Sequence, residues 1–465
     1  MKQDNRTQCH RLERLGRRRV EADFQGGRLT SDGGVLLLRE VESRFGVIEG
    51  FSRCFEDHRE QSQVEFSVPE LVGQRVFGLA LGYEDVNDHD DLRRDPLLAV
   101  AVGREDAEGQ RRSLERDRGA GLAGKSTLNR LELSAAEAGG RYRRTSLDFE
   151  RAADWLTELY VRCRQQEPEE LILDIDATDV LLHGDQEGRF FHGFYGDYCY
   201  LPLYIFCEGF VLCARLRPSN IDASAGAEED LERVIGRLRR AWPEVRIVVR
   251  GDSGFCREGL MSWCEENGVE YVFGLAKNAR LKRMAEPALE QARERHEHSG
   301  CSERVLDEAS YKTRKSWSRR RRVVIRADYN ERGANPRFVV TSLDPGHWPA
   351  KALYEQLYCA RCDAENRIKE QQLELFADRT STRLMRSNQL RLWFSALAYS
   401  LIHLLRVKAL QGSRLAKAQC STIRLRLFKI GAQIRISVRR VLVSMASGHP
   451  GQRLFAHALA RLRAG

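Results

Sequence analysis

The chain has 465 residues, of which 42% are hydrophobic and 31% are charged. This balance predicts packed globular domains and excludes wholesale disorder. The formal net charge is +9, and its distribution is uneven: the last 85 residues contain 16 Arg and Lys and no Asp or Glu, whereas the other 380 contain 60 basic and 67 acidic residues. Such a basic segment favours a polyanionic partner.

Neither secretion nor membrane insertion is predicted. The first twenty residues are charged throughout and lack the apolar core of a signal peptide. The longest apolar stretch, Leu392–Leu405, has 14 residues, whereas a membrane span needs about 20. The 12 cysteines include one Cys-x-x-Cys pair, Cys359 and Cys362, and predict reduced thiols rather than a disulfide scaffold or a zinc site. We therefore expect a cytoplasmic protein.

Residues 1–165 are predicted to form helices joined by polar loops. Helix-like apolar spacing recurs at residues 36–41, 71–81, 128–136 and 150–163. The segment Gly119–Ser126 matches the phosphate-loop pattern of nucleotide-binding proteins, but the polar residues before it do not form the buried strand that such a loop follows. We predict that the protein binds no nucleotide.

From residue 166 to 280 the pattern changes to alternating strands and helices. Strands are predicted at 171–176, 203–207, 210–216, 245–249 and 271–275, and helices at 228–242 and 258–267. Three antiparallel strands that are extended by parallel strands through crossover helices form the plan of a ribonuclease-H-like core.

The remaining chain divides into three segments. Residues 281–348 are predicted as a β-rich insertion, with a charged helix over 279–297 and strands at 322–326 and 337–341. Helical patterns resume over 349–410 and complete the core, and residues 411–465 form a basic C-terminal region with a strand over 423–430 and further helix. The predicted fold class is α/β: a ribonuclease-H-like catalytic core interrupted by a small β-rich insertion and flanked by helical N-terminal and basic C-terminal regions.

Two predicted strands carry carboxylates at corresponding places. Asp174 and Asp176 lie two residues apart, hence on one face of the first strand, and the strand over 245–249 runs directly toward Asp252. Carboxylates beside apolar strands cost several kcal/mol unless a cation neutralises them. Oxygen ligands of this kind suit Mg²⁺.

The helix after the insertion completes an acidic set. Its residues Tyr358, Arg361, Glu365, Lys369 and Gln372 are spaced three or four apart and form one stripe. The neighbouring stripe is apolar and is predicted to dock on the sheet, which points Glu365 toward the strand carboxylates.

These motifs resemble those of a known family. The Leu-Asp-x-Asp-x-Thr strand ending at Thr178, the Arg250–Phe255 segment and the Tyr358, Arg361 and Glu365 spacing are similar to DDE transposases of bacterial insertion sequences, in the branch with a β-insertion inside the ribonuclease-H-like core. The segments 192–194 and 216–220 are also similar to core segments of this family. The sequence departs from the family at Gln372, where a lysine is expected, and Lys369 is the candidate substitute.

The resemblance implies a DNA transposase that cleaves insertion-sequence ends and transfers the strand into target DNA in a metal-dependent reaction. Asp176, Asp252 and Glu365 are its implied catalytic residues and the ligands of two Mg²⁺ ions, for which Mn²⁺ is expected to substitute. Asp174 and Asp179 stay alternatives to Asp176 as the first acid.

Further residues are assigned supporting or DNA-binding roles, in two groups. Those expected near the acids are Thr178, Arg250, Tyr358, Arg361 and Lys369. Those expected in the insertion are Trp317, Arg320 and Arg322, for base stacking and phosphate contact.

The expected partners are double-stranded DNA, both terminal inverted repeats and target, and a second copy of the chain in a synaptic complex. The resemblance places recognition of the inverted repeats in the N-terminal helices and localises the protein to the nucleoid. Two alternatives stay open: a structure-specific metal-dependent nuclease on the same core, and a non-catalytic DNA-binding regulator derived from a transposase.

Overall fold

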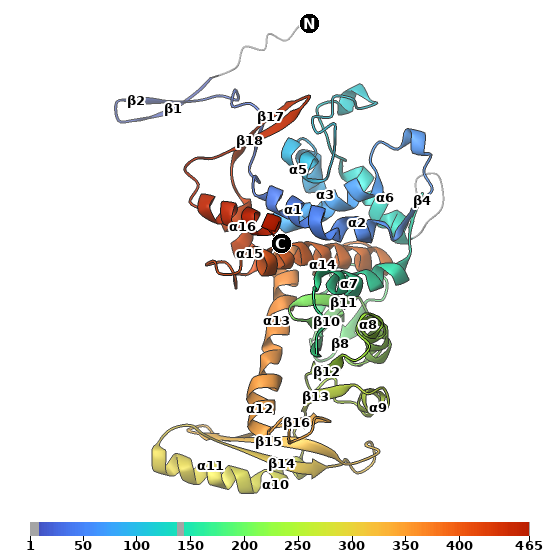
Figure 1. Ribbon diagram of the computed structural model, residues 1–465, viewed down its shortest axis with the longest axis vertical. Coiled ribbons are helices and arrows are strands. Elements are labelled where there is room, and N and C mark those ends of the chain that lie inside the picture. Colours follow the sequence, from blue (N-terminus) through green and yellow to red (C-terminus); the bar gives the residue numbers. More distant parts are fainter. Residues whose placement is uncertain (1–8, 137–143, 465) are drawn as a thin grey trace.

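A single mixed β-sheet is the centre of the molecule. The computed structural model describes residues 9–136 and 144–464. The sheet has eight strands in the order β11-β10-β6-β12-β13-β16-β15-β14 (Figure 1). Their bounds, in chain order, are β6 Glu170–Ala177, β10 Leu203–Cys207, β11 Phe210–Arg215, β12 Arg246–Gly251, β13 Glu270–Leu275, β14 Glu303–Tyr311, β15 Arg321–Asn330 and β16 Gly333–Thr341.

The directions of these strands decide which side chains meet. β10 is antiparallel to both β6 and β11, whereas β12 is parallel to β6 with Arg250 opposite Asp174, and β13 is parallel to β12. The carboxyl ends of β6 and β12 therefore lie at the same edge of the sheet. This edge receives Asp176 from the end of β6 and Asp252 from the residue after β12.

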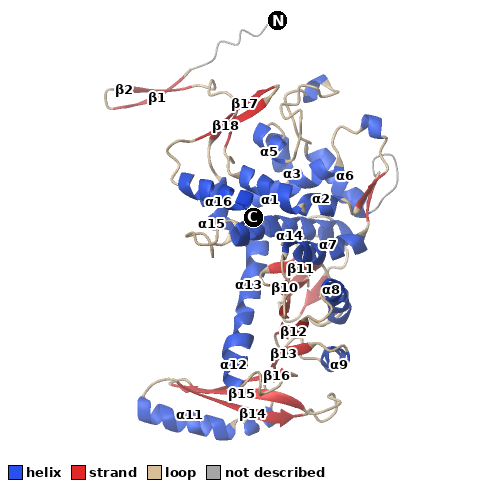
Figure 2. Cartoon of the chain, in the orientation of Figure 1, coloured by secondary structure: helices blue, strands red, loops and turns tan. Residues whose placement is uncertain are grey.

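Helices cover both faces of the sheet (Figure 2). On one face, α7 (Phe149–Cys163) and the crossover helices α8 (Ala227–Ala241) and α9 (Glu258–Glu266) share a hydrophobic core with Leu171, Leu173 and Ile175 of β6. On the other face, Leu353, Tyr354 and Leu357 pack against Val248 and Val272. Alternate residues of each strand thus face different helices, as the period of two requires.

The segment predicted as an insertion continues this sheet. β16 pairs antiparallel with β13, β15 with β16, and β14 with β15. Helices α10 (Ala279–Met284) and α11 (Glu286–Ser299) precede these strands, and α11 lies against them at the lower end of the molecule (Figure 1). The predicted runs 322–326 and 337–341 fall within β15 and β16.

A long helical rod connects this end to the rest of the protein (Figure 1). It consists of α12 (Ala350–Ala352), a π-helical segment over Leu353–Tyr358, a 3-10 turn over Cys359–Arg361, α13 (Cys362–Lys369) and a second π-helical segment over Glu370–Glu374. The rod carries the predicted stripe from Tyr358 to Gln372.

The N-terminal helices form a layer around one buried helix, α14 (Met385–Lys408). α14 is long and apolar enough to cross a membrane by length and composition, but 89% of its most apolar window is buried inside the protein. Its Arg391 and Arg75 of the layer both pair with the fully buried Glu132. The helices of the layer are α1 Val35–Phe45, α2 Val47–Ser52, α3 Val68–Leu81, α4 His89–Leu92, α5 Pro96–Ala101 and α6 Lys125–Ala136.

The phosphate-loop match lies in this layer. A 3-10 turn over Glu115–Asp117, rather than a buried strand, precedes Gly119, and α6 begins at Lys125. The local structure is therefore that of a helix entry.

The two ends of the chain meet in strands that the sequence did not predict. β1 (His10–Leu15) and β2 (Arg18–Ala22) form a projecting hairpin, and β3 (Leu29–Thr30) pairs with β17 (Ala432–Ser437), which pairs with β18 (Arg440–Met445). The strand predicted over 423–430 is wrong: α15 (Cys420–Ile423) and a π-helical segment over Arg424–Phe428 occupy it. Arg424 donates to the carbonyls of Leu79 and Ala80 at the end of α3, so tertiary contacts override the alternating pattern.

The remaining described elements are short strands and the last helix: β4 Phe55–Asp57, β5 Thr145–Leu147, β7 Val180–Leu181, β8 Phe190–His192, β9 Asp197–Tyr200 and α16 Gln452–Ala464.

Candidate active site

One guanidinium group connects the predicted acids. Arg361 Nη2 lies 2.5 Å from Glu365 Oε1, and Arg361 Nη1 lies 3.7 Å from Asp176 Oδ2. Burial opposes ionisation of Arg361, but the negative charges of Asp176, Glu365 and Asp252 raise its pKa. Arg361 therefore pairs with Glu365 and lies close to Asp176, and the charge of Asp252 also acts on it.

The carboxyl group of Asp176 has a strongly raised pKa. Burial, together with the negative charges of Asp252 and Glu365, raises the pKa of Asp176 from 3.8 to about 7, although Arg361 opposes the shift. Its Oδ1 accepts a hydrogen bond from the Ala177 amide at 2.9 Å. The Asp176 carboxylate therefore lacks enough nearby positive charge to offset its burial. A buried carboxylate of this kind is a candidate ligand for a cation.

Asp174, the first alternative acid, is engaged elsewhere. Arg250 donates Nε and Nη2 to its two oxygens at 2.5 and 2.7 Å, and donates Nη1 to the Leu357 carbonyl at 2.5 Å. This buried bidentate pair joins β6, β12 and the helical rod. The geometry therefore favours Asp176 over Asp174 as a ligand and assigns Arg250 a structural contact.

The end of the rod contacts the loop that follows Asp176. Gln372 Nε2 donates to the Asp179 carbonyl at 2.9 Å and lies 3.5 Å from Thr178 Oγ1. Lys369 is exposed on the rod. The residue that replaces the family's lysine thus orients the loop between Asp176 and β7, which includes the second alternative acid, Asp179.

A glycine that the sequence did not single out permits the rod to approach the sheet. A Cβ atom on Gly274 of β13 would lie 2.6 Å from the Tyr358 hydroxyl oxygen and 3.0 Å from the Ser253 amide nitrogen. Tyr358 therefore packs at the turn that carries Asp252, whose Oδ1 accepts from the Gly254 amide at 2.7 Å. Only a residue without a side chain fits between them.

The predicted DNA-binding residues of the insertion are not brought to the acids. Trp317 is 5% exposed and packs edge-on against Tyr311. Arg322 pairs with Glu308 and lies three strands from Arg250 along one row of the sheet, which is about 14 Å at the usual strand spacing. Arg320 donates to the Ser310 carbonyl at 3.2 Å.

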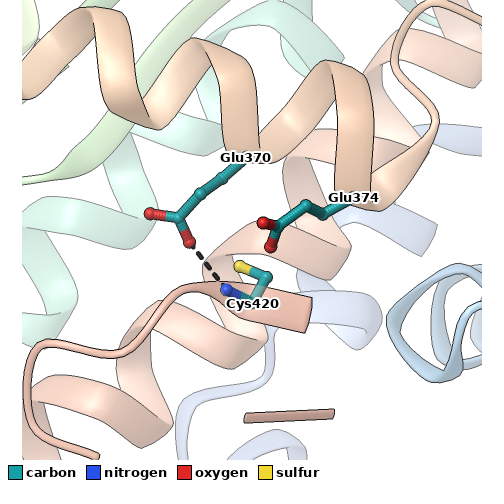
Figure 3. Close-up of side chains that lie close together, drawn as sticks. All are labelled: Glu370, Glu374 and Cys420. Carbon is teal, nitrogen blue, oxygen red and sulfur yellow. Dashed lines mark hydrogen bonds between the residues drawn. The ribbon is translucent and has the colours of Figure 1, made fainter. Parts of the chain in front are cut away.

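A second acidic cluster lies farther along the rod. Ligand atoms of Glu370, Glu374 and Cys420 lie within 4.8 Å of one another (Figure 3). However, Glu370 is paired with Arg367 and Arg406, and the two glutamates accept from the amides of Cys420 and Ser421 at the start of α15.

Burial raises the pKa of the Cys420 thiol well above its ordinary value, so the sulfur stays protonated. These contacts explain the cluster as a helix cap and ion pair rather than a metal site.

Comparison with known proteins places the chain in a family. A family model described as "Transposase DDE domain group 1" matches residues 12–465. The chain belongs to this family of DDE transposases. No curated protein sequence matches it. Among solved structures, it is similar to a piggyBac transposase synaptic complex with hairpin DNA, with 12% identity, a TM-score of 0.38, and coverage of 86% of this chain and 79% of that one.

The perturbed Asp176 predicts a pH dependence of the transposase's stability. Because its folded pKa of about 7 exceeds the ordinary 3.8, the folded state binds more protons than the unfolded chain between these values. The free energy of unfolding therefore falls as pH rises through this window. In EDTA, Asp176→Asn is expected to be more stable than wild type by roughly 1–4 kcal/mol above pH 7 and equal to it near pH 4.

Urea unfolding at the two pH values measures this difference. Asp185→Asn is the matched control, because the Asp185 side chain is fully exposed. An Asp176→Asn variant that is no more stable than wild type at the higher pH would show that the Asp176 carboxyl is not electrostatically strained.

Proposed function

We propose that this transposase cleaves DNA at the ends of a bacterial insertion sequence and joins the freed end to target DNA, on a ribonuclease-H-like core. The observation that carries the proposal is that Arg361 pairs with Glu365 and lies 3.7 Å from Asp176, with the charge of Asp252 also acting on it, in a chain of the DDE family. The strand order β11-β10-β6-β12-β13, with three antiparallel and two parallel strands, supports the assignment of the core.

The acids fit the divalent cation that the family normally uses. All three offer carboxylate oxygens, which are the ligands that Mg²⁺ and Mn²⁺ prefer. They come from two adjacent strand ends and one helix. Burial, with the charges of Asp252 and Glu365, raises the pKa of Asp176 to about 7 although Arg361 opposes the shift, which favours a further cation at this carboxylate. When bound, a pair of such ions would activate the attacking oxygen and stabilise the leaving oxygen at the scissile phosphate.

The chain's own residues position this site. The Asp174–Arg250 pair and its hydrogen bond to the Leu357 carbonyl hold the rod on the sheet, and Gly274 admits Tyr358 beside the Asp252 turn. Arg361 pairs with Glu365 and lies close to Asp176 in the structure. Once cations compensate these acids, we infer that its guanidinium turns to a phosphate oxygen of the DNA strand, for which its bidentate geometry is suited.

The C-terminal positive charge divides into two parts. Arg391, Arg406 and Lys429 pair with Glu132, Glu370 and Asp32 inside the protein. Arg435, Arg439 and Arg440 are exposed on the β17–β18 hairpin. Some of the positive charges of this region are therefore paired with acids inside the protein, and others are exposed on its surface.

The β1–β2 hairpin adds a second exposed basic surface. Arg14, Arg17, Arg18 and Arg19 are exposed on it, and it projects from the same end of the molecule as the β17–β18 hairpin (Figure 1). A two-stranded ribbon fits the major groove of DNA, and arginines on it meet the phosphates. We propose that both hairpins bind duplex DNA outside the active site.

The joining reaction requires two DNA ends, and this is the reason to propose that two copies of the chain act together in the cytoplasm. The nuclease alternative predicts cleavage without joining, and the regulator alternative predicts binding without either.

Removal of a proposed ligand is expected to abolish cleavage. Asp252→Ala and Glu365→Ala should each lower the rate of Mg²⁺-dependent cleavage by at least about 100-fold. Each substitution removes a carboxylate that is proposed to hold the cation at the scissile phosphate. DNA affinity in a gel-shift assay should stay within about twofold of wild type. Asp363→Ala, an exposed acid on the same helix, is the control and should cleave normally.

A strand-transfer assay with pre-cut ends then separates a transposase from a nuclease. Cleavage that survives either acid substitution contradicts the assignment of the site, and cleavage without joining supports the nuclease alternative.

The basic hairpins predict a salt-dependent contribution to DNA affinity. A variant with Arg17→Ala, Arg18→Ala and Arg19→Ala should bind duplex DNA more weakly, and the slope of log K against log salt concentration should fall by roughly 0.9 for each phosphate that the variant no longer neutralises. Arg293→Ala, which removes a charge that is paired with Glu290 at 2.5 Å, is the control. If the slope is unchanged in the triple variant, the duplex does not contact the β1–β2 hairpin.

A further inference from the structure

Aromatic side chains crowd the β8–β9 hairpin. Between Phe190 and Tyr198 the chain holds five of them, of which Phe190, Phe191, Phe194 and Tyr198 are 42%, 57%, 85% and 41% exposed. Single exposed apolar residues are ordinary, but several large aromatic residues together on one exposed hairpin mark an interaction site. None of them contributes to the core that the site requires.

The hairpin is fixed to the edge of the sheet that carries the acids. β7 begins four residues after Asp176, β9 pairs with β7, and β8 pairs with β9. Two hydrogen bonds anchor this unit: the Thr178 amide donates to the Pro202 carbonyl at 3.2 Å, and Ser219 Oγ donates to the Phe190 carbonyl at 2.9 Å. The hairpin that carries the exposed rings is therefore joined through β7 to the segment that follows Asp176.

The electrostatics of the hairpin agree with this placement. Burial raises the pKa of Tyr195 to about 12, and the negative charges of Asp179, Asp176 and Asp252 contribute to the shift. Tyr195 in turn contacts the ring of Phe194, with centroids 5.0 Å apart. Phe194 therefore packs against Tyr195, the pKa of which is raised in part by the charges of Asp176 and Asp252.

The rings are arranged so that flat faces stay accessible. Phe191 meets Tyr198 edge-to-face at 5.6 Å, Phe194 meets Tyr195 edge-to-face, and the Arg189 guanidinium lies 3.9 Å from the centroid of Tyr198. Aromatic faces and a stacked arginine, rather than aliphatic side chains, are the groups that bind nucleobases. Arg189 is also paired with Asp185, so the rings rather than net charge define the ligand.

We propose that the β8–β9 hairpin is a stacking platform for unpaired bases of the DNA strand whose phosphate is held at the three acids. The proposal rests on the proposed function, which brings DNA to this edge. Bases inside a duplex already have neighbours on both faces, so the platform would bind bases that have left the stack. The buried Trp317 cannot serve this purpose without a rearrangement, whereas Phe194 is accessible as it stands.

The test compares two DNA probes without divalent cation, so that binding is measured independently of cleavage. One probe is a blunt duplex, and the other carries a single-stranded extension with 2-aminopurine in place of adenine. Wild-type protein should bind the extended probe more tightly and quench its fluorescence. Phe194→Ala should reduce this preference by roughly 5- to 100-fold, and Phe194→Trp should retain it.

Leu114→Ala is the matched control, because Leu114 is 51% exposed and lies outside both this hairpin and the two basic hairpins, and it should leave the preference unchanged. If Phe194→Ala keeps the wild-type preference while wild type cleaves DNA, the platform is wrong and the proposed function stands. If the preference is lost as predicted but no variant or condition yields cleavage, the platform stands and the catalytic proposal fails. A Phe194→Ala protein that changes oligomeric state with unaltered preference would assign this surface to a second copy and overturn the inference.

Discussion

The site depends on the burial of Asp176 close to other charged groups. Burial is the largest cause of its raised pKa, and the negative charges of Asp252 and Glu365 add to it. Two parallel strands end at one edge, and a helical rod packed across the sheet adds the third acid. In the structure, Arg361 lies between Asp176 and Glu365 and supplies a compensating positive charge. The pKa of Asp176 is raised to about 7 in spite of this charge, chiefly by burial. An arrangement that is strained without a cation and relieved by one is what metal-dependent phosphoryl transfer needs.

The surrounding structure keeps the rod in register with the strands. The buried Asp174–Arg250 pair fixes the rod through the Leu357 carbonyl, Gly274 leaves room for Tyr358, and Gln372 holds the loop after Asp176. At its far end, Glu370 and Glu374 accept from the amides at the start of α15, and Glu370 pairs with Arg406 of α14 (Figure 3). The rod thus connects the strands of residues 281–348 to the helical layer, and it carries both Glu365 and the glutamates that contact α15.

Much of the candidate site could be predicted from the sequence, because it depends on residues that lie close together in the chain. Strand period two placed Asp174 and Asp176 on one face, and helical spacing placed Arg361 beside Glu365. The choice between Asp174 and Asp176 was not accessible, since it depends on Arg250, 76 residues away. The same holds for Trp317, which Tyr311 covers, and for β3, which finds its partner at the other end of the chain. The strand expected over 423–430 failed because contacts with α3 outweigh a local alternation of apolar and basic residues.

Binding of Mn²⁺ to the free protein, followed by electron paramagnetic resonance, tests the central claim most directly because the molecule holds two acidic clusters. The account predicts that Asp252→Asn weakens Mn²⁺ binding at least about tenfold, whereas Glu374→Gln, which alters the cluster of Figure 3, leaves it unchanged. Mn²⁺ binding that is lost in Glu374→Gln and retained in Asp252→Asn would contradict it.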